Sequence, residues 1–136
     1  MTIESPFYRV SVKALVFDAE RRLLVVQERN GLWEVPGGGW EHGETLEECV
    51  RREVDEELGA HVRTIDRSQI VPCAGRGHRY HRIQLALRVQ LEDGELIPGD
   101  GMQATRYVTR EEFAELPVGN GDESLQADAD LLWQLA

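Results

Sequence analysis

Apolar residues in this chain recur mostly at every second position or in short continuous runs, a pattern that predicts β-strands. Strands are expected over residues 8–17, 23–26, 61–65, 69–73, 83–91 and 105–108. The polar segment 18–22 separates the first two strands, which are expected to pair as a hairpin. Residues 29–40 hold three consecutive glycines after a proline, which predicts a loop whose backbone bends tightly or closely approaches a ligand.

The longest helix is expected over residues 45–58. Thr45 and Glu48 form a capping-box pattern at its start, and Gly59 stands where a C-cap glycine belongs. Further helices are expected at about residues 110–116 and over 123–135. Strands around a central helix, with more helix at the end, indicate a mixed α/β fold. The length of 136 residues fits one domain over residues 1–136.

The charge of the chain excludes one broad class of function. A net charge of −10 and a pI of about 4.8 argue against a protein that coats a nucleic-acid polymer. Between positions 41 and 57, eight acidic residues stand against two basic ones and supply −6 of that charge. The segment 76–82 instead has three arginines, two histidines and no acid. An acidic protein can still act on phosphates where metal ions or such a basic segment intervene.

The sequence also bears on the compartment. No apolar run approaches the ~20 residues of a transmembrane helix, and the first residues lack the basic and apolar regions of a secretory signal. Cys49 and Cys73 cannot form a disulfide scaffold and have no zinc-site spacing. We therefore expect a cytoplasmic protein without a membrane partner.

The central helix is expected to carry glutamates beside its apolar stripe. At ~100° per residue, four apolar side chains form a stripe of the kind that faces a core. These are Leu46, Val50, Val54 and Leu58. Glu57 falls inside the stripe, Glu53 at its edge and Glu56 further round the same side.

Two interpretations of these glutamates are open. A solvated acidic face is the ordinary meaning of a charge run, but it predicts glutamates opposite the apolar stripe. A carboxylate inside the stripe is costly unless it is paired or bound to a metal. Clustered oxygen ligands suit a hard cation such as Mg²⁺, which is usually shared with substrate phosphates. Together with the glycine-rich loop, they suggest metal-assisted attack of water on phosphorus.

The segment from Gly38 to Ala60 resembles the Nudix box. That pattern is Gly, five residues, Glu, seven residues, Arg-Glu-aliphatic-any-Glu-Glu-any-Gly-aliphatic. The matching positions are Gly38, Glu44, Arg52, Glu53, Val54, Glu56, Glu57, Gly59 and, as a small residue in the last place, Ala60. The resemblance implies a single Nudix domain, with a mixed β-sheet sandwiched between α-helices.

The same resemblance implies a chemistry and assigns roles within the box. It implies a pyrophosphohydrolase that uses Mg²⁺ or Mn²⁺ to cleave a nucleoside diphosphate linked to another moiety (NDP-X). Glu53 and Glu57 correspond to the main carboxylate ligands, Glu56 to a further ligand or the base, and the backbone at Gly38 to another ligand. The pair Arg52 and Glu44 corresponds to residues that orient the helix and its glutamates.

Candidate substrate contacts lie outside most of the box. The three arginines of the basic segment, Arg76, Arg79 and Arg82, can neutralise diphosphate oxygens, because guanidinium groups match phosphate geometry. The alternative is that these arginines lie at a solvent-exposed strand end and have no role in binding. Tyr80 is a candidate for stacking on a base, against the alternative of a core residue, and Trp40 for lining the site.

Several questions stay open at the level of sequence. The base is Glu56, or Asp100 in the later glycine-rich loop, or neither if metal-bound hydroxide acts with weak assistance. The expected ligand is a small nucleotide, such as a nucleoside triphosphate or another NDP-X compound. The alternative to an enzyme is a non-catalytic sensor of nucleotide or sugar diphosphates, which a degraded box would favour. A homodimer is also left open.

Overall fold

The computed structural model describes residues 7–76, 81–99 and 101–136 as strands, helices and their connections. In chain order the elements are β1 (Tyr8–Leu15), β2 (Leu23–Glu28), β3 (Trp33–Glu34), β4 (Gly37–Gly39), α1 (Leu46–Leu58), β5 (Val62–Arg76), β6 (His81–Leu91), β7 (Met102–Val108), α2 (Arg110–Glu115), α3 (Glu123–Ala127) and α4 (Ala129–Trp133). No helix in these ranges is long and apolar enough to cross a lipid bilayer.

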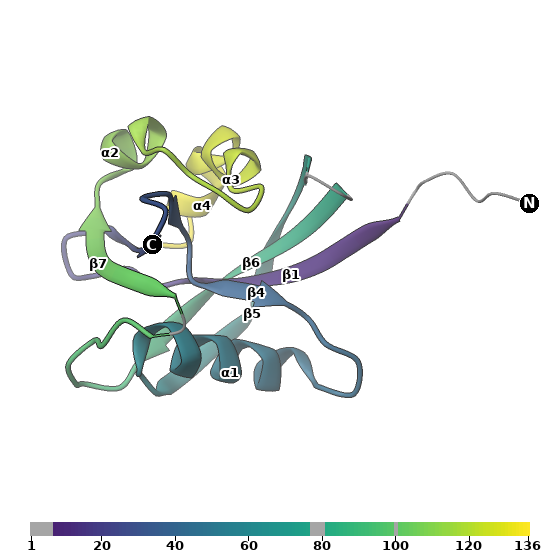
Figure 1. The fold of residues 1–136 in the computed structure, drawn as a ribbon, viewed down its shortest axis with the longest axis horizontal. Coiled ribbons are helices and arrows are strands. Elements are labelled where there is room, and N and C mark those ends of the chain that lie inside the picture. The colour runs from purple at the N-terminus through teal and green to yellow at the C-terminus, as the bar shows by residue number, and fades with distance from the viewer. Residues whose placement is uncertain (1–6, 77–80, 100) are drawn as a thin grey trace, which may run out of the picture.

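The strands form two sheets that lie between helices. One sheet has the order β4-β1-β6-β5, with β1 and β6 parallel and the outer pairs antiparallel. The other has the order β3-β2-β7 and is antiparallel. Helix α1 covers one side of this strand layer, and α2, α3 and α4 cover the other (Figure 1). The mixed sheet between helices is the architecture that the sequence predicted.

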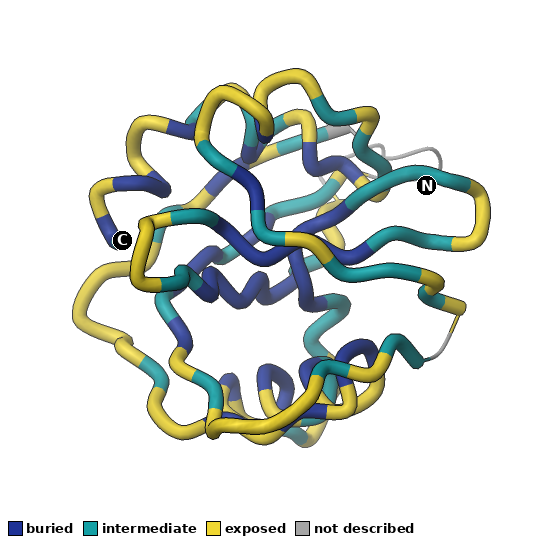
Figure 2. Tube along the Cα trace, turned by 90° about the vertical axis from the view of Figure 1, so that its left-hand side faces the viewer, coloured by how far each residue is buried: buried dark blue, intermediate teal, exposed yellow. Residues whose placement is uncertain are grey.

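Period-two alternation along the strands builds a separate core on each side. In β1, Val12 and Ala14 join the core beneath α1, whereas Leu15 joins the core beneath α2–α4. In β2, Leu24 and Val26 face the α1 core, and the alternate residues face the other one. The buried positions accordingly concentrate between the helices (Figure 2). Both cores hold the central strands, and through them α1, in fixed positions.

The structure corrects the predicted hairpin and the predicted loop. Strands β1 and β2 belong to different sheets and meet antiparallel only at the bridge between Phe17 and Leu23, because β4 and β6 occupy both edges of β1. The glycine-rich segment, expected to be a loop, contributes the short strands β3 and β4. Its three glycines are the residues of β4 that pair with β1.

Two further element boundaries differ from the prediction. The strands expected at 61–65 and 69–73 are one strand, β5, whose pairing with β6 shifts register between Ile65 and Ile70. The C-terminal helix breaks into α3 and α4 at Asp128, whose side chain accepts a hydrogen bond from the thiol of Cys73 (3.2 Å).

Helix α1 begins and ends as its sequence predicted. The Thr45 side chain accepts from the Glu48 backbone N–H (3.1 Å), and the Glu48 carboxylate accepts from the Thr45 N–H (3.0 Å). Gly59 ends the helix with φ 59°, in the left-handed region where glycine is favoured. These caps fix which residues of α1 face β4.

The close pairing of β4 with β1 predicts a specific sensitivity at Gly37. This residue has φ 137°, and a Cβ there would overlap the carbonyl oxygen of Val12. Gly37→Ala should therefore lower the free energy of unfolding by about 2–3 kcal/mol more than Gly31→Ala does. Gly31 is the matched control, since it also has positive φ (88°) but has nothing within 4 Å of its added Cβ. Equal losses in urea unfolding would show that β4 does not need this close approach.

Candidate active site

Glu57 is the buried acidic residue of α1. Its exposed fraction is 4%, as its place within the apolar stripe predicted. The backbone N–H of Gly37 donates to its Oε1 (3.3 Å). Its other carboxylate oxygen, Oε2, is also buried and has no hydrogen-bond partner among the described residues. A buried oxygen without a partner is unfavourable, and a bound proton or cation would stabilise it.

Glu53 lies one turn earlier on α1, against the same strand. A Cβ at Gly38 would lie 2.5 Å from its Oε1, so the missing side chain of Gly38 makes the room that this carboxylate occupies. The two carboxyl groups interact. The pKa of Glu57 is raised to about 10, first by burial, then by the charge of Glu34, and further by the neighbouring carboxyl group of Glu53. Without a cation, Glu57 is therefore held in its protonated form at neutral pH.

Arg52 connects the other glutamates of the box. Its guanidinium makes a two-pronged contact with Glu44, from Nη2 to Oε1 (2.8 Å) and from Nε to Oε2 (3.1 Å). It also lies 2.8 Å from Glu53 Oε1 and 3.4 Å from Glu56 Oε2. The hydrogen bonds from Arg52 lower the pKa of Glu44 to about 2, so this carboxylate is ionised at neutral pH. Arg52 thus ties Glu53 to the loop that precedes the helix.

Strand β4 presents backbone groups to α1 along its free edge. The peptide groups of Pro36 and Trp40 bond to β1 (Ala14 N to Pro36 O, 2.8 Å; Trp40 N to Val10 O, 2.9 Å). In an antiparallel pair only every second residue of a strand bonds to the partner strand, so the peptide groups of Gly37 and Gly39 point away from β1. The Gly37 N–H does reach Glu57, and the Gly39 carbonyl accepts from Arg52 Nη2 (3.1 Å). Gly38 lies between them, with its Cα against Glu53.

The donor set fits a hard divalent cation. Two converging carboxylates, an orphaned buried oxygen and nearby backbone carbonyls are the oxygen ligands that Mg²⁺ and Mn²⁺ prefer. Within the described ranges, no three acidic, histidine or cysteine side chains form a ready-made cage. Arg52 contacts two of the candidate ligands, Glu53 and Glu56.

A buried ion pair next to this site was missed at the level of sequence. Lys13 of β1 is 2% exposed, and its Nζ lies 3.4 Å from Asp122 Oδ1 and donates to the Val35 carbonyl (3.0 Å). The other oxygen of Asp122 accepts from the Val35 N–H (2.7 Å). The pair thus holds both sides of the residue that links β3 to β4. The one indication of this ion pair in the sequence was a lysine within the apolar run of β1.

Glu34 of β3 extends the buried polar group. Burial raises the pKa of its carboxyl to about 7, against the opposing effects of the Lys13 charge and of a hydrogen bond from the Asn120 side chain. Asn120 adopts φ 57° in the loop before α3 and also donates to Glu28 (2.9 Å).

The predicted substrate residues divide between described and undescribed parts of the chain. Arg79, Tyr80 and Asp100 lie outside the described residues, as does the side chain of Arg76. Arg82 is the second residue of β6 and stands in register with Arg9 of β1.

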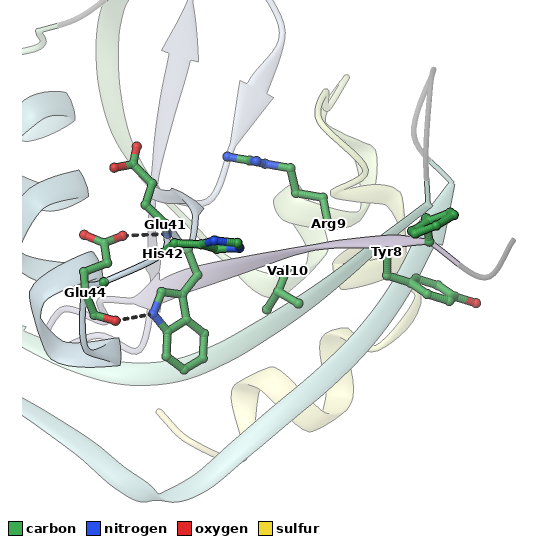
Figure 3. Close-up of a pocket in the computed structure, with 9 residues that line it drawn as sticks. Tyr8, Arg9, Val10, Glu41, His42 and Glu44 are labelled. Carbon is green, nitrogen blue, oxygen red and sulfur yellow. Dashed lines mark hydrogen bonds between the residues drawn. The ribbon is translucent and has the colours of Figure 1, made fainter. Parts of the chain in front are cut away.

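Trp40 donates through Nε1 to the Glu44 carbonyl (2.9 Å) and lines a cavity of about 920 Å³ beside the box (Figure 3). The other lining residues are Phe7, Tyr8, Arg9, Val10, Glu41, His42, Gly43 and Glu44.

Comparison with known proteins decides the family. The NUDIX domain family matches residues 7–128 of the chain. The chain belongs to the Nudix hydrolase family. Its Nudix box is the loop and helix that bring Glu53, Glu57 and Gly38 together. A MutT-like protein of Streptomyces ambofaciens is 32% identical over 111 residues, which are 81% of this chain and 70% of that protein.

Other relatives of this Nudix domain match shorter parts. An NAD-capped RNA hydrolase NudC of Vibrio parahaemolyticus is 39% identical over 58% of this chain, and an ADP-ribose pyrophosphatase of Methanocaldococcus jannaschii 28% identical over 68%. The chain spans only 30% and 57% of those two proteins. A MutT protein structure from Methanosarcina mazei shares the fold, with a TM-score of 0.78 over 98% of this chain and 97% of that one, at 19% identity.

The raised pKa of Glu57 predicts how stability depends on pH without metal. In the unfolded chain this carboxyl ionises near pH 4.5, but in the fold it ionises near pH 10. Between these values the folded protein binds more protons, so the free energy of unfolding should fall as pH rises. Glu57→Gln should remove up to about 1.4 kcal/mol per pH unit of this fall. Urea unfolding in EDTA at pH 5.5 and 8.5 measures it, and identical slopes for both proteins would contradict the assignment.

Proposed function

We propose that this protein is a divalent-cation-dependent pyrophosphohydrolase that cleaves the diphosphate of a small NDP-X compound by attack of water on phosphorus. The observation that carries the proposal is Glu57, whose buried carboxylate has an oxygen without a partner among the described residues and lies beside Glu53 and the backbone of β4. Such an arrangement destabilises the fold when no cation is bound, and it is favourable for holding a cation.

Each residue of the site has a proposed role. Glu53 and Glu57 would hold Mg²⁺ or Mn²⁺ together with a backbone oxygen of the Gly37–Gly38 segment, and β4 alternation favours the Gly37 carbonyl. When bound, the cation supplies charge neutralisation for the phosphates and activation of water. Glu56 is the more exposed glutamate, with 41% of its side chain accessible, and serves as a further ligand or as the base. Arg52 and Glu44 are positioning residues.

The proposed substrate class is supported by the compounds for which the relatives are named. Those named above include an ADP-ribose pyrophosphatase and an NAD-capped RNA hydrolase, and a UDP-X diphosphatase shares the fold with a TM-score of 0.77. Their names have in common a diphosphate attached to a nucleoside. The net charge of −10 repels such an anion, so a cation that neutralises both partners is needed for productive binding.

This proposal predicts strict cation dependence and a large effect at Glu57. A panel of nucleoside triphosphates, ADP-ribose, UDP-sugars and dinucleoside polyphosphates with Mg²⁺ or Mn²⁺ should include hydrolysed compounds, and exhaustive EDTA should abolish the reaction. Glu57→Gln keeps the shape of the side chain but removes its charge, so kcat should fall by a factor on the order of 10² or more. Released phosphate and nucleotide products are the readout.

Glu47→Gln is the matched control for that variant. Glu47 lies on the same helix, but its side chain is half exposed and, in the described parts of the chain, forms an ion pair only with Arg67 (3.7 Å). This control should keep kcat within about twofold, since isolated exposed charges contribute little. Hydrolysis that persists in EDTA, or full turnover by Glu57→Gln at saturating metal, would overturn the proposal. Tight nucleotide binding with no turnover of the panel would instead indicate a sensor.

A further inference from the structure

Arg9 of β1 extends over the face of β4 that is opposite α1. A Cβ at Gly39 would overlap the guanidinium group of Arg9, so the guanidinium lies directly on the Cα of this glycine. In Figure 3 the Arg9 side chain runs from β1 toward the loop of Glu41 and His42 and away from Val10. Gly39 has a backbone conformation open to any residue, so here the glycine makes room for a side chain from another strand.

The guanidinium group has no hydrogen bond or ion pair with any described residue. Of the two acids in the adjacent loop, Glu44 is already held by Arg52 at 2.8 Å, and Glu41 lies 3.9 Å from the same arginine. Arg9 is exposed and lines the cavity of about 920 Å³ that opens beside β4. A cation that has no acidic partner among the described residues and lines a cavity, in a protein of charge −10, is available for an anionic ligand.

The position of Arg9 relates it to the cation site. Gly38 and Gly39 are adjacent in β4, and their missing side chains point to opposite faces of the strand. Glu53 occupies the space at Gly38 and Arg9 the space at Gly39. The two charged groups are therefore on the order of 10 Å apart, since consecutive Cα atoms are 3.8 Å apart. A polyphosphate attacked near Glu53 needs to pass only the free edge of β4 to reach Arg9.

We propose that Arg9 binds a phosphate group of the substrate beyond the diphosphate that is cleaved, and that Gly39 is required so that it can do so. This inference rests on the proposed function and narrows the substrate class. It favours compounds with three or more phosphates, or compounds whose second moiety carries its own phosphate, over those with a simple diphosphate. Arg9 is thus a specificity residue, and neither the cation nor the attacked phosphorus depends on it.

The test compares substrates that differ by one phosphate, namely ADP and ATP, and diadenosine di- and triphosphate, with ADP-ribose as a further two-phosphate compound. Wild type should have the lower KM for the longer member of each hydrolysed pair. Arg9→Met should raise that KM about 10- to 100-fold, which is the loss expected for a charged hydrogen-bonded contact, with little change in kcat. The KM for two-phosphate compounds should stay within about twofold. Arg67→Met, at an exposed arginine of β5, is the matched control and should change neither.

Gly39→Ala tests the geometry independently of the charge. The added methyl group must displace the flexible end of Arg9, so it should raise KM for the longer substrates while the guanidinium is still present. The double variant Gly39→Ala/Arg9→Met should then show no further increase over Arg9→Met, because both changes remove one interaction. Additive increases would overturn the role of Gly39.

The outcomes separate this inference from the function on which it rests. If wild type hydrolyses compounds of the panel but prefers no longer member, or if Arg9→Met raises the KM of short and long substrates equally, Arg9 does not bind a further phosphate. If wild type hydrolyses nothing with any divalent cation, the proposed function itself fails, and the inference fails with it.

Discussion

The burial of the Glu57 carboxylate against β4 is the constraint on which the rest of the site depends. One of its oxygens receives only the Gly37 N–H at 3.3 Å, and the other receives nothing from the described residues. Burial raises the pKa of this group to about 10. An acid in such a place lowers the free energy of unfolding. A cation that binds only the native state and neutralises the acid raises that free energy again by mass action. We therefore propose that this carboxylate is half of a cation-binding site.

The other half is the glycine strand, and the fold holds it from two sides. Gly37, Gly38 and Gly39 bring β4 against β1, and each absent side chain leaves room for a different group. The buried pair of Lys13 and Asp122 fixes the approach to this strand by holding the peptide groups of Val35. Removing one partner of such a pair leaves an uncompensated buried charge, a change that costs about 3–5 kcal/mol. Because two separate cores lock β1 and α1, the carboxylates meet β4 in a defined geometry.

Much of this could be predicted from sequence, and the rest could not for physical reasons. Helix α1 was predicted with its caps and with Glu57 inside the apolar stripe, since periodicity and capping are local properties. The predicted pairing of β1 with β2 was wrong, because the alternation of apolar residues shows which side chains face a core but not which strand lies alongside. The role of Lys13 depends on Asp122, more than a hundred residues later, and no local pattern joins them. Arg9 was missed for the same reason, as its significance lies in contact with Gly39.

The role proposed for Glu57 is tested most directly by counting the cations that the protein binds. Free Mn²⁺ can be measured by its electron paramagnetic resonance signal during titration into metal-free protein at pH 7.5. We expect saturable binding by wild type and at least a tenfold weaker affinity, or one site fewer, for Glu57→Gln, while Glu47→Gln binds as wild type does. Equal Mn²⁺ affinity and number of sites in wild type and Glu57→Gln would show that Glu57 holds no cation.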